Sequence, residues 1–203
     1  SADWRSIAVA AAGVSAPVAV RKALKKSAQS HRPSRVTFSN LDKVYWPAEG
    51  FTKGDLLAYY EQVADVLLPY LRGRPIHLNR FPDGIAGKNF YQKEAKEGTP
   101  DWIRTVVIGS KSRKEKELRY MVCDERDTLL YLVNLGSIDL HPWMSRVESQ
   151  DSPDWAVIDL DPKDAPFTDV IRIAREVGRL FRGIGLKPYL KTSGSTGLHV
   201  FVG

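Results

Sequence analysis

A short run that ends in two aspartates, residues 157–162 (Val-Ile-Asp-Leu-Asp-Pro), most constrains what this chain can fold into. The strand predicted at 155–160 is nearly all apolar, as is typical of a strand buried at the centre of a sheet. Residues two apart on a strand share a face, so we expect Asp159 and Asp161 side by side, about 7 Å apart along the chain. Pro162 cannot donate to the ladder and ends the strand. The chain is therefore predicted to build a sheet around a buried strand that ends in two carboxylates.

The segments around this strand predict an α/β (α+β) fold, with a mixed sheet flanked by helices. Thr52 is a candidate N-cap with Asp55 three residues later, and apolar residues follow at helical spacing up to Leu71, with Gly73 after them. The other predicted elements are strands at 76–78, 103–108, 118–123, 187–192 and 198–202, a hairpin loop at 110–117, and helices at 128–135 and 166–182. The last helix is expected to turn six side chains inward: Val170, Ile173, Ala174, Val177, Leu180 and Phe181.

Composition excludes several classes of protein. The 203 residues are 43% hydrophobic and 27% charged, which is ordinary for one domain with its own core. The sequence has no run of about 18 apolar residues that would form a membrane-spanning helix. The single cysteine, Cys123, excludes a disulfide framework and a cysteine-rich zinc site. We therefore expect a cytoplasmic protein with no membrane partner.

The net charge of +6 is concentrated at one end of the chain. Residues 1–53 contain nine basic and three acidic side chains, which gives +6, whereas residues 54–203 contain 21 of each. Residues 1–35 are rich in Ala, Ser and Lys and are predicted to be a basic linker or arm. This charge is suited to a polyanion held by phosphate contacts, but a solvated linker explains it equally well.

The aspartate pair predicts a divalent-metal site. Two carboxylates at the end of a buried strand repel each other unless a cation joins them. Mg²⁺ and Mn²⁺ prefer oxygen ligands and often act in pairs on phosphate groups. Asp159 and Asp161 are therefore candidate metal ligands for phosphoryl chemistry. From these residues alone two alternatives stay open: the carboxylates cap the next helix or lie in a solvated loop, or the D-x-D pattern belongs to a glycosyltransferase.

A glycine-containing turn follows one helix later, at residues 192–199 (Thr-Ser-Gly-Ser-Thr-Gly-Leu-His). Its two glycines let the backbone approach an anion closely, and successive N–H groups in such a turn bind phosphate. Ser193 and Thr196 add hydroxyl groups, and His199 is able to reach a phosphate. The alternative is an ordinary hairpin turn with a core histidine. The chain contains no P-loop motif.

Six blocks in a fixed order give the chain a family resemblance. They lie at residues 42–47, 52–55, 89–93, 141–143, 159–162 and 192–199. From about Val36 to Gly203 the chain resembles the polymerase domain of bacterial DNA ligase D, a member of the archaeo-eukaryotic primase superfamily that works in non-homologous end joining. The resemblance implies a primase-polymerase-type catalytic domain at 36–203. Residues 1–35 then resemble the linker to a ligase module upstream, and the chain has no K-x-D-G adenylation motif of its own.

The resemblance implies roles for the two strongest motifs. Asp159 and Asp161 match the family's catalytic metal ligands. Ser193, Gly194 and His199 match the residues that hold the triphosphate of the incoming nucleotide.

Five further residues match the family's contacts with the sugar and with DNA. His141 matches a histidine that lines the nucleotide pocket near the sugar. Phe90 and Tyr91 match an aromatic pair near the template strand, where stacking on a base is physically reasonable. Lys43 and Lys53 match a lysine pair that grips the 5′-phosphate on the far side of a gap. Each also has a plain structural interpretation, as a core side chain for the rings and as a surface charge for the lysines.

The implied activity is a metal-dependent nucleotidyltransferase that adds nucleotides, preferably ribonucleotides, to primer 3′ ends for gap filling. The expected cofactor is Mn²⁺ (or Mg²⁺), and the expected partners are nucleoside triphosphates, DNA ends with a 5′-phosphate, and Ku, in the nucleoid of the bacterial cytoplasm. The family's third metal carboxylate falls beyond Gly203, so we expect the fold to be incomplete at its C-terminus. The alternative is a non-catalytic DNA-end or Ku-docking module, or a catalytically incomplete fragment.

Overall fold

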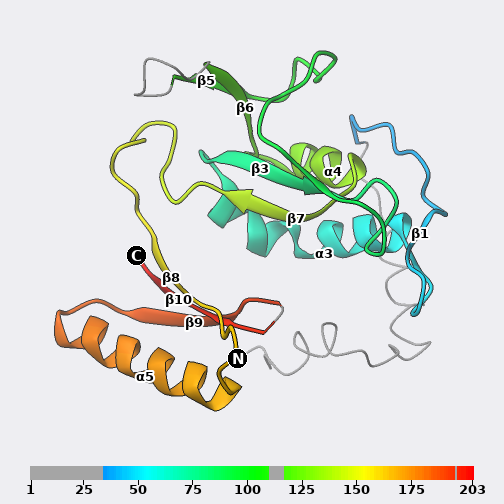
Figure 1. Ribbon diagram of the computed structural model, residues 1–203. Helices are drawn as coiled ribbons and strands as arrows, with labels where there is room; N and C mark the ends of the chain where they lie inside the picture. The colour runs from blue at the N-terminus through cyan, green and yellow to red at the C-terminus, as the bar shows by residue number, and fades with distance from the viewer. Residues whose placement is uncertain (1–33, 110–116, 195) are drawn as a thin grey trace. The chain divides into compact units, whose positions relative to one another are not determined.

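The computed structural model describes residues 34–109, 117–194 and 196–203 (Figure 1). The chain divides into two compact units, an N-terminal unit up to Glu148 and a C-terminal unit from Ser149 to Gly203. Each is described by itself. None of the helices in the described part of the chain has the length and apolar character needed to cross a membrane.

The N-terminal unit is built on an antiparallel sheet. Its elements in chain order are β1 (Val44–Trp46), β2 (Phe51–Thr52), α3 (Lys53–Leu71), β3 (Pro75–Arg80), β4 (Phe90–Gln92), β5 (Thr105–Ile108), β6 (Leu118–Val122), α4 (Arg126–Asn134) and β7 (Ser137–Pro142). Strand β3 pairs with β4, β6 and β7, and β5 pairs with β6, while β1 and β2 form a separate ribbon. Strand β3 therefore connects most of the unit.

Helix α3 begins as the sequence predicts. The Thr52 side chain accepts a hydrogen bond from the Asp55 N–H, and the Asp55 carboxylate accepts one from the Thr52 N–H at 2.8 Å. This capping box satisfies two backbone donors that the first turn of a helix leaves unpaired. After the helix, Gly73 has a φ of +68°, a conformation that glycine adopts at little cost.

The core of the N-terminal unit lies between its two helices and one face of the sheet. Ile76 and Leu78 of β3 pack with Leu129 and Leu132 of α4, and all four side chains are fully buried. Figure 1 shows α3 and α4 beside β3 and β7. Because side chains alternate along a strand, the residues between these apolar ones lie on the opposite face of the sheet. That face is polar, and it carries the residues discussed below.

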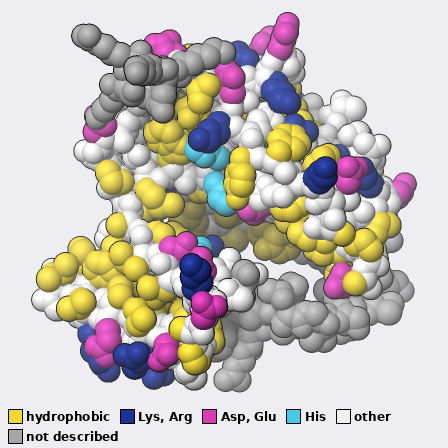
Figure 2. Space-filling model, viewed as in Figure 1, with side chains coloured by type: hydrophobic (Ala, Val, Ile, Leu, Met, Phe, Trp, Pro, Cys, Tyr) yellow, Lys and Arg dark blue, Asp and Glu magenta, His cyan; other side chains and the backbone are white. Residues whose placement is uncertain are grey.

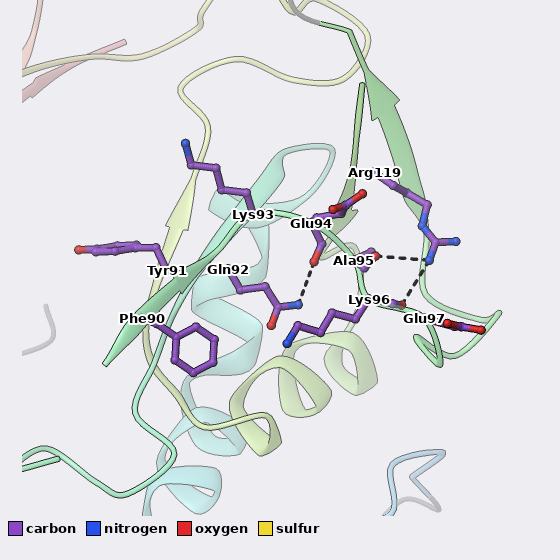
Figure 3. A pocket seen from close by; sticks show the side chains of 9 residues that line it. All are labelled: Phe90, Tyr91, Gln92, Lys93, Glu94, Ala95, Lys96, Glu97 and Arg119. Carbon is purple, nitrogen blue, oxygen red and sulfur yellow. Dashed lines mark hydrogen bonds between the residues drawn. The ribbon is translucent and has the colours of Figure 1, made fainter. Parts of the chain in front are cut away.

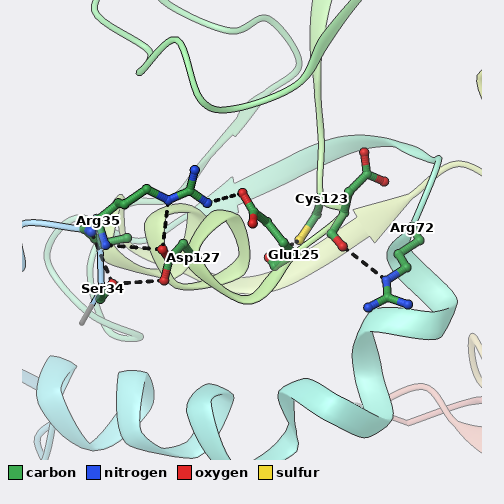
Figure 4. A network of polar contacts seen from close by, with 8 residues as sticks. Ser34, Arg35, Arg72, Cys123, Glu125 and Asp127 are labelled. Carbon is green, nitrogen blue, oxygen red and sulfur yellow. Dashed lines mark hydrogen bonds and ion pairs between the residues drawn. The ribbon is translucent and has the colours of Figure 1, made fainter. Parts of the chain in front are cut away.

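The first described residues are attached to the start of α4 (Figure 4). Arg35 Nε donates to Asp127 Oδ2 at 3.0 Å and Ser34 Oγ donates to Asp127 Oδ1 at 3.1 Å, while the Arg35 guanidinium also pairs with Glu125. Burial raises the pKa of Asp127, but these hydrogen bonds outweigh it, so the pKa lies below its usual value. The last two residues of the predicted arm thus contact the domain. The rest of that arm, residues 1–33, lies outside the described residues.

The C-terminal unit is a three-stranded antiparallel sheet with one helix. Its elements are β8 (Ala156–Leu160), α5 (Phe167–Gly183), β9 (Pro188–Thr192) and β10 (Leu198–Val202), and the strand order is β8-β10-β9. Helix α5 packs on β10 and β9. Its buried residues Val170 and Ala174 contact Leu198 and Val200 of β10. Strand β10 is thus the central strand of this small sheet and also the strand on which the helix packs.

Two predictions about this unit are wrong. Strand β8 was expected to be central and buried, but it is at the edge of the three-stranded sheet, and Ile158 is 38% exposed. Its apolar residues suggested burial, whereas position in a sheet depends on which strands pair with it. In α5, Ile173 and Leu180 were expected to face inward but are 44% and 72% exposed, because three strands cover only part of the helix's apolar stripe. Figure 2 shows hydrophobic side chains gathered on this unit.

Four strands were not predicted: β1, β2, β4 and β7. Strand β7 is the most important of them because it carries His141. Its sequence alternates polar and apolar residues, which is the usual pattern of a half-buried strand. The hairpin loop expected at 110–117 falls mostly outside the described residues, but β5 and β6 on either side of it are paired as an antiparallel hairpin.

Candidate active site

The first aspartate of the pair faces a histidine on the neighbouring strand. Asp159 on β8 is the direct partner of His199 on β10, and His199 Nε2 lies 3.2 Å from Asp159 Oδ1. The Asp159 side chain is 56% exposed and that of His199 is 22% exposed. The structure therefore brings together the D-x-D motif and the histidine that ends the glycine turn, and it leaves the carboxylate open to a ligand.

The second aspartate packs against the glycine turn itself. A Cβ atom added to Gly197 would overlap Asp161 Oδ1 and lie 2.6 Å from the Leu160 carbonyl oxygen, so only glycine fits this position. Ser193 N donates to the Gly197 carbonyl at 3.0 Å, and Gly197 N donates to Ser193 Oγ at 2.9 Å. Gly194 has a φ of +93°, which favours glycine. The predicted turn residues are thus found beside the carboxylates that they were expected to accompany.

Lys191 is a residue of this site that the sequence analysis missed. It lies on β9 as the direct partner of His199, so Asp159, His199 and Lys191 form a row across three strands. Directly paired residues share a face of a sheet. Lys191 Nζ also lies 5.9 Å from the centre of the Phe201 ring on that face. The sequence shows Lys191 only as a lysine near the end of a short predicted strand. Its place beside His199 depends on the register between strands, which cannot be read from the sequence.

The donors at this site suit a hard divalent cation. Carboxylate oxygens are the protein ligands that Mg²⁺ and Mn²⁺ prefer, and Asp159 and Asp161 supply them within three residues. Among residues 34–109, 117–194 and 196–203, no group of three or more His, Cys, Asp or Glu side chains is arranged to hold an ion. Two carboxylates are the kind of protein ligand that Mg²⁺ commonly combines with oxygens of a phosphate ligand and water.

In the N-terminal unit, His141 lies on the polar face of the sheet. Its Nε2 is 2.6 Å from Asp139 Oδ2, and the Tyr91 ring lies edge-on to it, with 5.6 Å between ring centres. Directly across on β3 is His77, whose Nε2 accepts a hydrogen bond from Trp143 Nε1 at 3.1 Å. Burial, and then the nearby Lys93 and His141, lower the pKa of His77. Sequence reasoning found His141 but not its carboxylate partner.

The two aromatic residues of β4 do not share a face. Tyr91 is paired with Asn79 and Phe90 with Arg80, so consecutive side chains point in opposite directions, as Figure 3 shows. Tyr91 is 62% exposed and contacts His141. Phe90 lies between two cations, 5.3 Å from the Arg80 guanidinium and 5.9 Å from Lys96 Nζ. Both rings line a shallow groove of about 880 Å³ that runs along residues 90–97.

The two lysines near the start of α3 differ in exposure. Lys43 Nζ pairs with Asp83 Oδ1 at 2.7 Å on the surface. Lys53 is only 4% exposed, and its Nζ donates to the Ser39 carbonyl at 2.7 Å. Burial, followed by the charges of Lys43 and Arg80, lowers the pKa of Lys53. The plain interpretation of Lys53 as a surface charge is therefore wrong.

The predicted site residues fall into two groups, one in each unit. Asp159, Asp161, Ser193, Gly194 and His199 belong to the C-terminal unit, and the strand register places them together. The N-terminal unit contains Lys43, Lys53, Phe90, Tyr91 and His141, of which Tyr91 and His141 are in contact.

Comparison with known proteins gives a consistent result. Residues 52–203 match the family model described as LigD, primase-polymerase domain. The chain is 34% identical over 174 residues to the multifunctional non-homologous end joining protein LigD of Mycolicibacterium smegmatis, covering 84% of this chain and 22% of that protein. It is 31% identical over 169 residues to the bifunctional protein LigD of Bacillus subtilis, covering 83% of this chain and 26% of that protein.

A solved structure is also similar. The polymerase domain from Mycobacterium tuberculosis ligase D in complex with DNA has a TM-score of 0.76 and 31% sequence identity, covering 84% of this chain and 61% of that chain. The chain thus spans 22% to 26% of the length of these two curated relatives and less than two thirds of the solved domain.

Proposed function

The chain belongs to the LigD primase-polymerase domain family, and we propose that it is a metal-dependent nucleotidyltransferase that extends primer 3′ ends at DNA breaks. In this reaction the primer 3′-hydroxyl attacks the α-phosphate of a nucleoside triphosphate, a new P–O bond forms, and pyrophosphate leaves. Ribonucleotides are the expected substrates, and gap filling during non-homologous end joining is the expected process.

One observation carries the proposal: the two carboxylates, the histidine and the glycine turn meet at one end of one small sheet. Asp159 faces His199 across β8 and β10, and Asp161 packs against Gly197. Acidic oxygens beside backbone N–H groups and a basic side chain are what binding of a metal-bound triphosphate requires. A helix cap or a solvated loop does not need this juxtaposition.

The residues of the C-terminal unit then have distinct tasks. Asp159 and Asp161 would hold a divalent cation, Mn²⁺ or Mg²⁺, which would neutralise charge on the triphosphate and activate the attacking hydroxyl. His199 holds Asp159 in place and, with Lys191 on the same face, offers donors to the phosphates. The turn that contains Ser193 and Gly194 binds a phosphate oxygen through its backbone. Positioning and charge neutralisation supply most of the rate in such reactions.

For the residues of the N-terminal unit we propose the contacts with the sugar and with DNA that the family motifs imply. His141 contacts a nucleotide sugar, and the exposed ring of Tyr91 stacks on a template base, while Phe90 and Lys96 line the same groove from the other face of β4. When DNA binds, Lys43 leaves its ion pair with Asp83 and pairs with the 5′-phosphate of the downstream strand. Lys53 is buried, and its backbone N–H donates to the Lys43 carbonyl, so it adds positive charge close to Lys43. These roles rest on the family motifs together with the exposure of each side chain.

A primer-extension assay with Mn²⁺ tests the enzymatic role. We expect the double variant Asp159→Asn, Asp161→Asn to extend at least about 100-fold more slowly, because the loss of both metal ligands removes charge stabilisation of the transition state. Asp164→Asn is the matched control, since this exposed aspartate lies after β8 and outside the cluster. Mn²⁺-dependent nucleotide binding, measured by calorimetry, gives a second readout if turnover is slow. Equal activity of the double variant and the unaltered chain would reject the assignment.

Binding to recessed DNA ends tests the role of Lys43. We expect the unaltered chain to prefer a 5′-phosphorylated end, and Lys43→Ala to lose most of that preference and to show a shallower dependence of affinity on salt. Lys187→Ala, in the other unit, removes the same charge and is expected to keep the preference. Unchanged preference in Lys43→Ala refutes the lysine's role without affecting the catalytic assignment.

Ku is the protein partner that we expect to recruit this domain to DNA ends in the bacterial nucleoid. The support is that the similar LigD proteins are named for non-homologous end joining. Adding the chain to purified Ku bound to linear DNA should produce a slower complex in a gel shift. A complex that forms equally well without Ku would refute this partnership.

A further inference from the structure

A row of polar side chains crosses three strands on the face of the N-terminal sheet that is turned away from the core. Tyr91 on β4 is the direct partner of Asn79 on β3, and Asn79 is in turn the partner of Asp139 on β7. One step along the same face, His77 is the partner of His141. Cross-strand partners share a face and lie within contact distance. This places Asp139 between Asn79 and His141.

The hydrogen bonds along this row all lead to the Asp139 carboxylate as the final acceptor. Asn89 Nδ2 donates to Asn79 Oδ1 at 2.8 Å, which leaves the Asn79 amide nitrogen as the donor to Asp139. Asp139 Oδ2 lies 2.6 Å from His141 Nε2. Burial raises the pKa of Asp139, but the hydrogen bond and charge of His141, followed by the Asn79 amide, outweigh it, so the pKa lies below its usual value. The carboxylate is therefore ionised at neutral pH and accepts from both neighbours.

An ionised carboxylate cannot donate a hydrogen bond, so the proton on His141 must lie on the nitrogen that faces Asp139. We propose that Asp139 is a positioning residue that fixes the ring direction and the Nε2–H tautomer of His141, so that Nδ1 is presented to the incoming nucleotide. The nucleotide part of this inference rests on the proposed function, whereas the tautomer does not. The second nitrogen of a histidine commonly sets the role of the first in this way.

The other groups around His141 do not replace Asp139 in this role. His77 already accepts from Trp143, Lys93 near His77 carries a basic side chain, and Tyr91 meets the imidazole in a T-shaped ring contact. None of them supplies an anionic acceptor to Nε2. Removal of the Asp139 charge should therefore change the tautomer of His141 even though the strands and the core stay intact.

The first test is the tautomer of His141 in the free chain, read from ¹⁵N chemical shifts of its ring at about pH 9, where ordinary histidines are neutral. We expect the Nε2–H form in the unaltered chain. In Asp139→Asn the new amide is able to donate to Nε2, so we expect a shift toward the Nδ1–H form. Asp101→Asn is the matched control, because this exposed aspartate changes the same charge away from His141. An identical tautomer in Asp139→Asn and the unaltered chain would overturn the proposal.

The second test is binding of GTP with Mg²⁺, measured by calorimetry. We expect Asp139→Asn to weaken binding about five- to tenfold, which corresponds to the loss of one hydrogen bond, and His141→Ala to weaken it by at least as much. A double variant should lose no more than His141→Ala alone, because Asp139 acts through His141.

The two tests separate the possible failures. GTP binding could stay unchanged in both Asp139→Asn and His141→Ala although the tautomer changes. This result would overturn the nucleotide role of His141, and with it the proposal that the contact of Asp139 with His141 serves nucleotide binding. Weaker binding in Asp139→Asn without any tautomer change would overturn the positioning mechanism. Additive losses in the double variant would do the same.

Discussion

The two units of this chain hold their functional residues by different physical means. In the N-terminal unit the polar row lies on a sheet whose other face is backed by two helices and a large buried core that includes Ile76, Leu78 and Leu132. In the C-terminal unit the buried cluster is much smaller, made of Val170, Ala174, Leu198 and Val200. Its carboxylates lie at the end of an edge strand rather than on a buried one.

This difference indicates which substitutions each group of functional residues tolerates without a change in backbone geometry. Where a large core fixes the strands, a polar side chain on the open face can be replaced and the backbone beneath it stays in place. Where few residues are buried, geometry depends on close contacts made by the backbone itself, such as the approach of Gly197 to Asp161. We therefore expect stability to be governed by the N-terminal unit and catalytic geometry by a few atoms of the C-terminal unit.

The largest expected effect comes from the larger of the two cores. Leu132→Ala should lower the free energy of unfolding by about 2–5 kcal/mol, because a fully buried leucine leaves a cavity in a well-packed region. Val200→Ala should cost about 2 kcal/mol, because fewer methyl groups are removed from a smaller cluster. Hydrogen exchange, measured separately for each segment of the chain, gives the loss of unfolding free energy in both variants. Equal loss of protection across both units in each variant would contradict the comparison, since it would mean that the units unfold together.

Gly197→Ala tests the C-terminal geometry directly. We expect nucleotide transfer to fall about 100-fold, or about 2.7 kcal/mol, because the new methyl group displaces Asp161 or the end of β8. Protection from hydrogen exchange in the N-terminal unit should not change. Gly183→Ala is the matched control, because a Cβ atom there meets nothing within 4 Å, and it should leave transfer unaltered. Similar losses in both variants would show that the contact with Asp161 is not the cause.

Arg35→Ala should have a moderate effect and lower the urea midpoint of the N-terminal unit slightly. Arg35 pairs with Asp127 and also lies 4.5 Å from the Trp102 ring centre, so its removal loses both contacts. The pKa of Asp127 is lowered in the folded state, so the pairing stabilises the protein above the unfolded-state value of about 3.9 and is lost as pH falls through the lower folded value. Urea titrations at pH 7 and pH 2.5 should therefore differ less in Arg35→Ala than in the unaltered chain.

The smallest expected effect is the contribution of His77 to the fall in stability at acid pH. Its pKa is lowered in the folded state, so the unfolded chain takes up a proton first, and stability falls as pH drops below the ordinary histidine value of about 6.5. His77→Gln should remove this part of the decline, and we expect a change in melting temperature of no more than about 2 °C between pH 7 and pH 5. A steeper decline in His77→Gln would contradict the direction of the shift.

Local features were predicted well from the sequence, because they depend on residues close together in the chain. The capping box at Thr52 and Asp55 and the strand, turn and strand around Ser193 to His199 are of this kind. Strand β7 was also predictable from its alternation but was overlooked, and with it the contact of Asp139 with His141. The burial of Lys53 gave no sequence signal, since a lysine near a helix start is usually exposed.

The sequence by itself determined the family, the strands on either side of the glycine turn and the chemical character of Asp159, Asp161 and His199. Only the tertiary structure decided that β8 is an edge strand, that His199 and Lys191 lie in one row with Asp159, and that Gly197 must be glycine. The physical reason is that strand order and register are set by hydrogen bonds between segments distant in the chain. Side-chain periodicity reports which face of a strand is apolar, but it carries no information about which strand lies next to it.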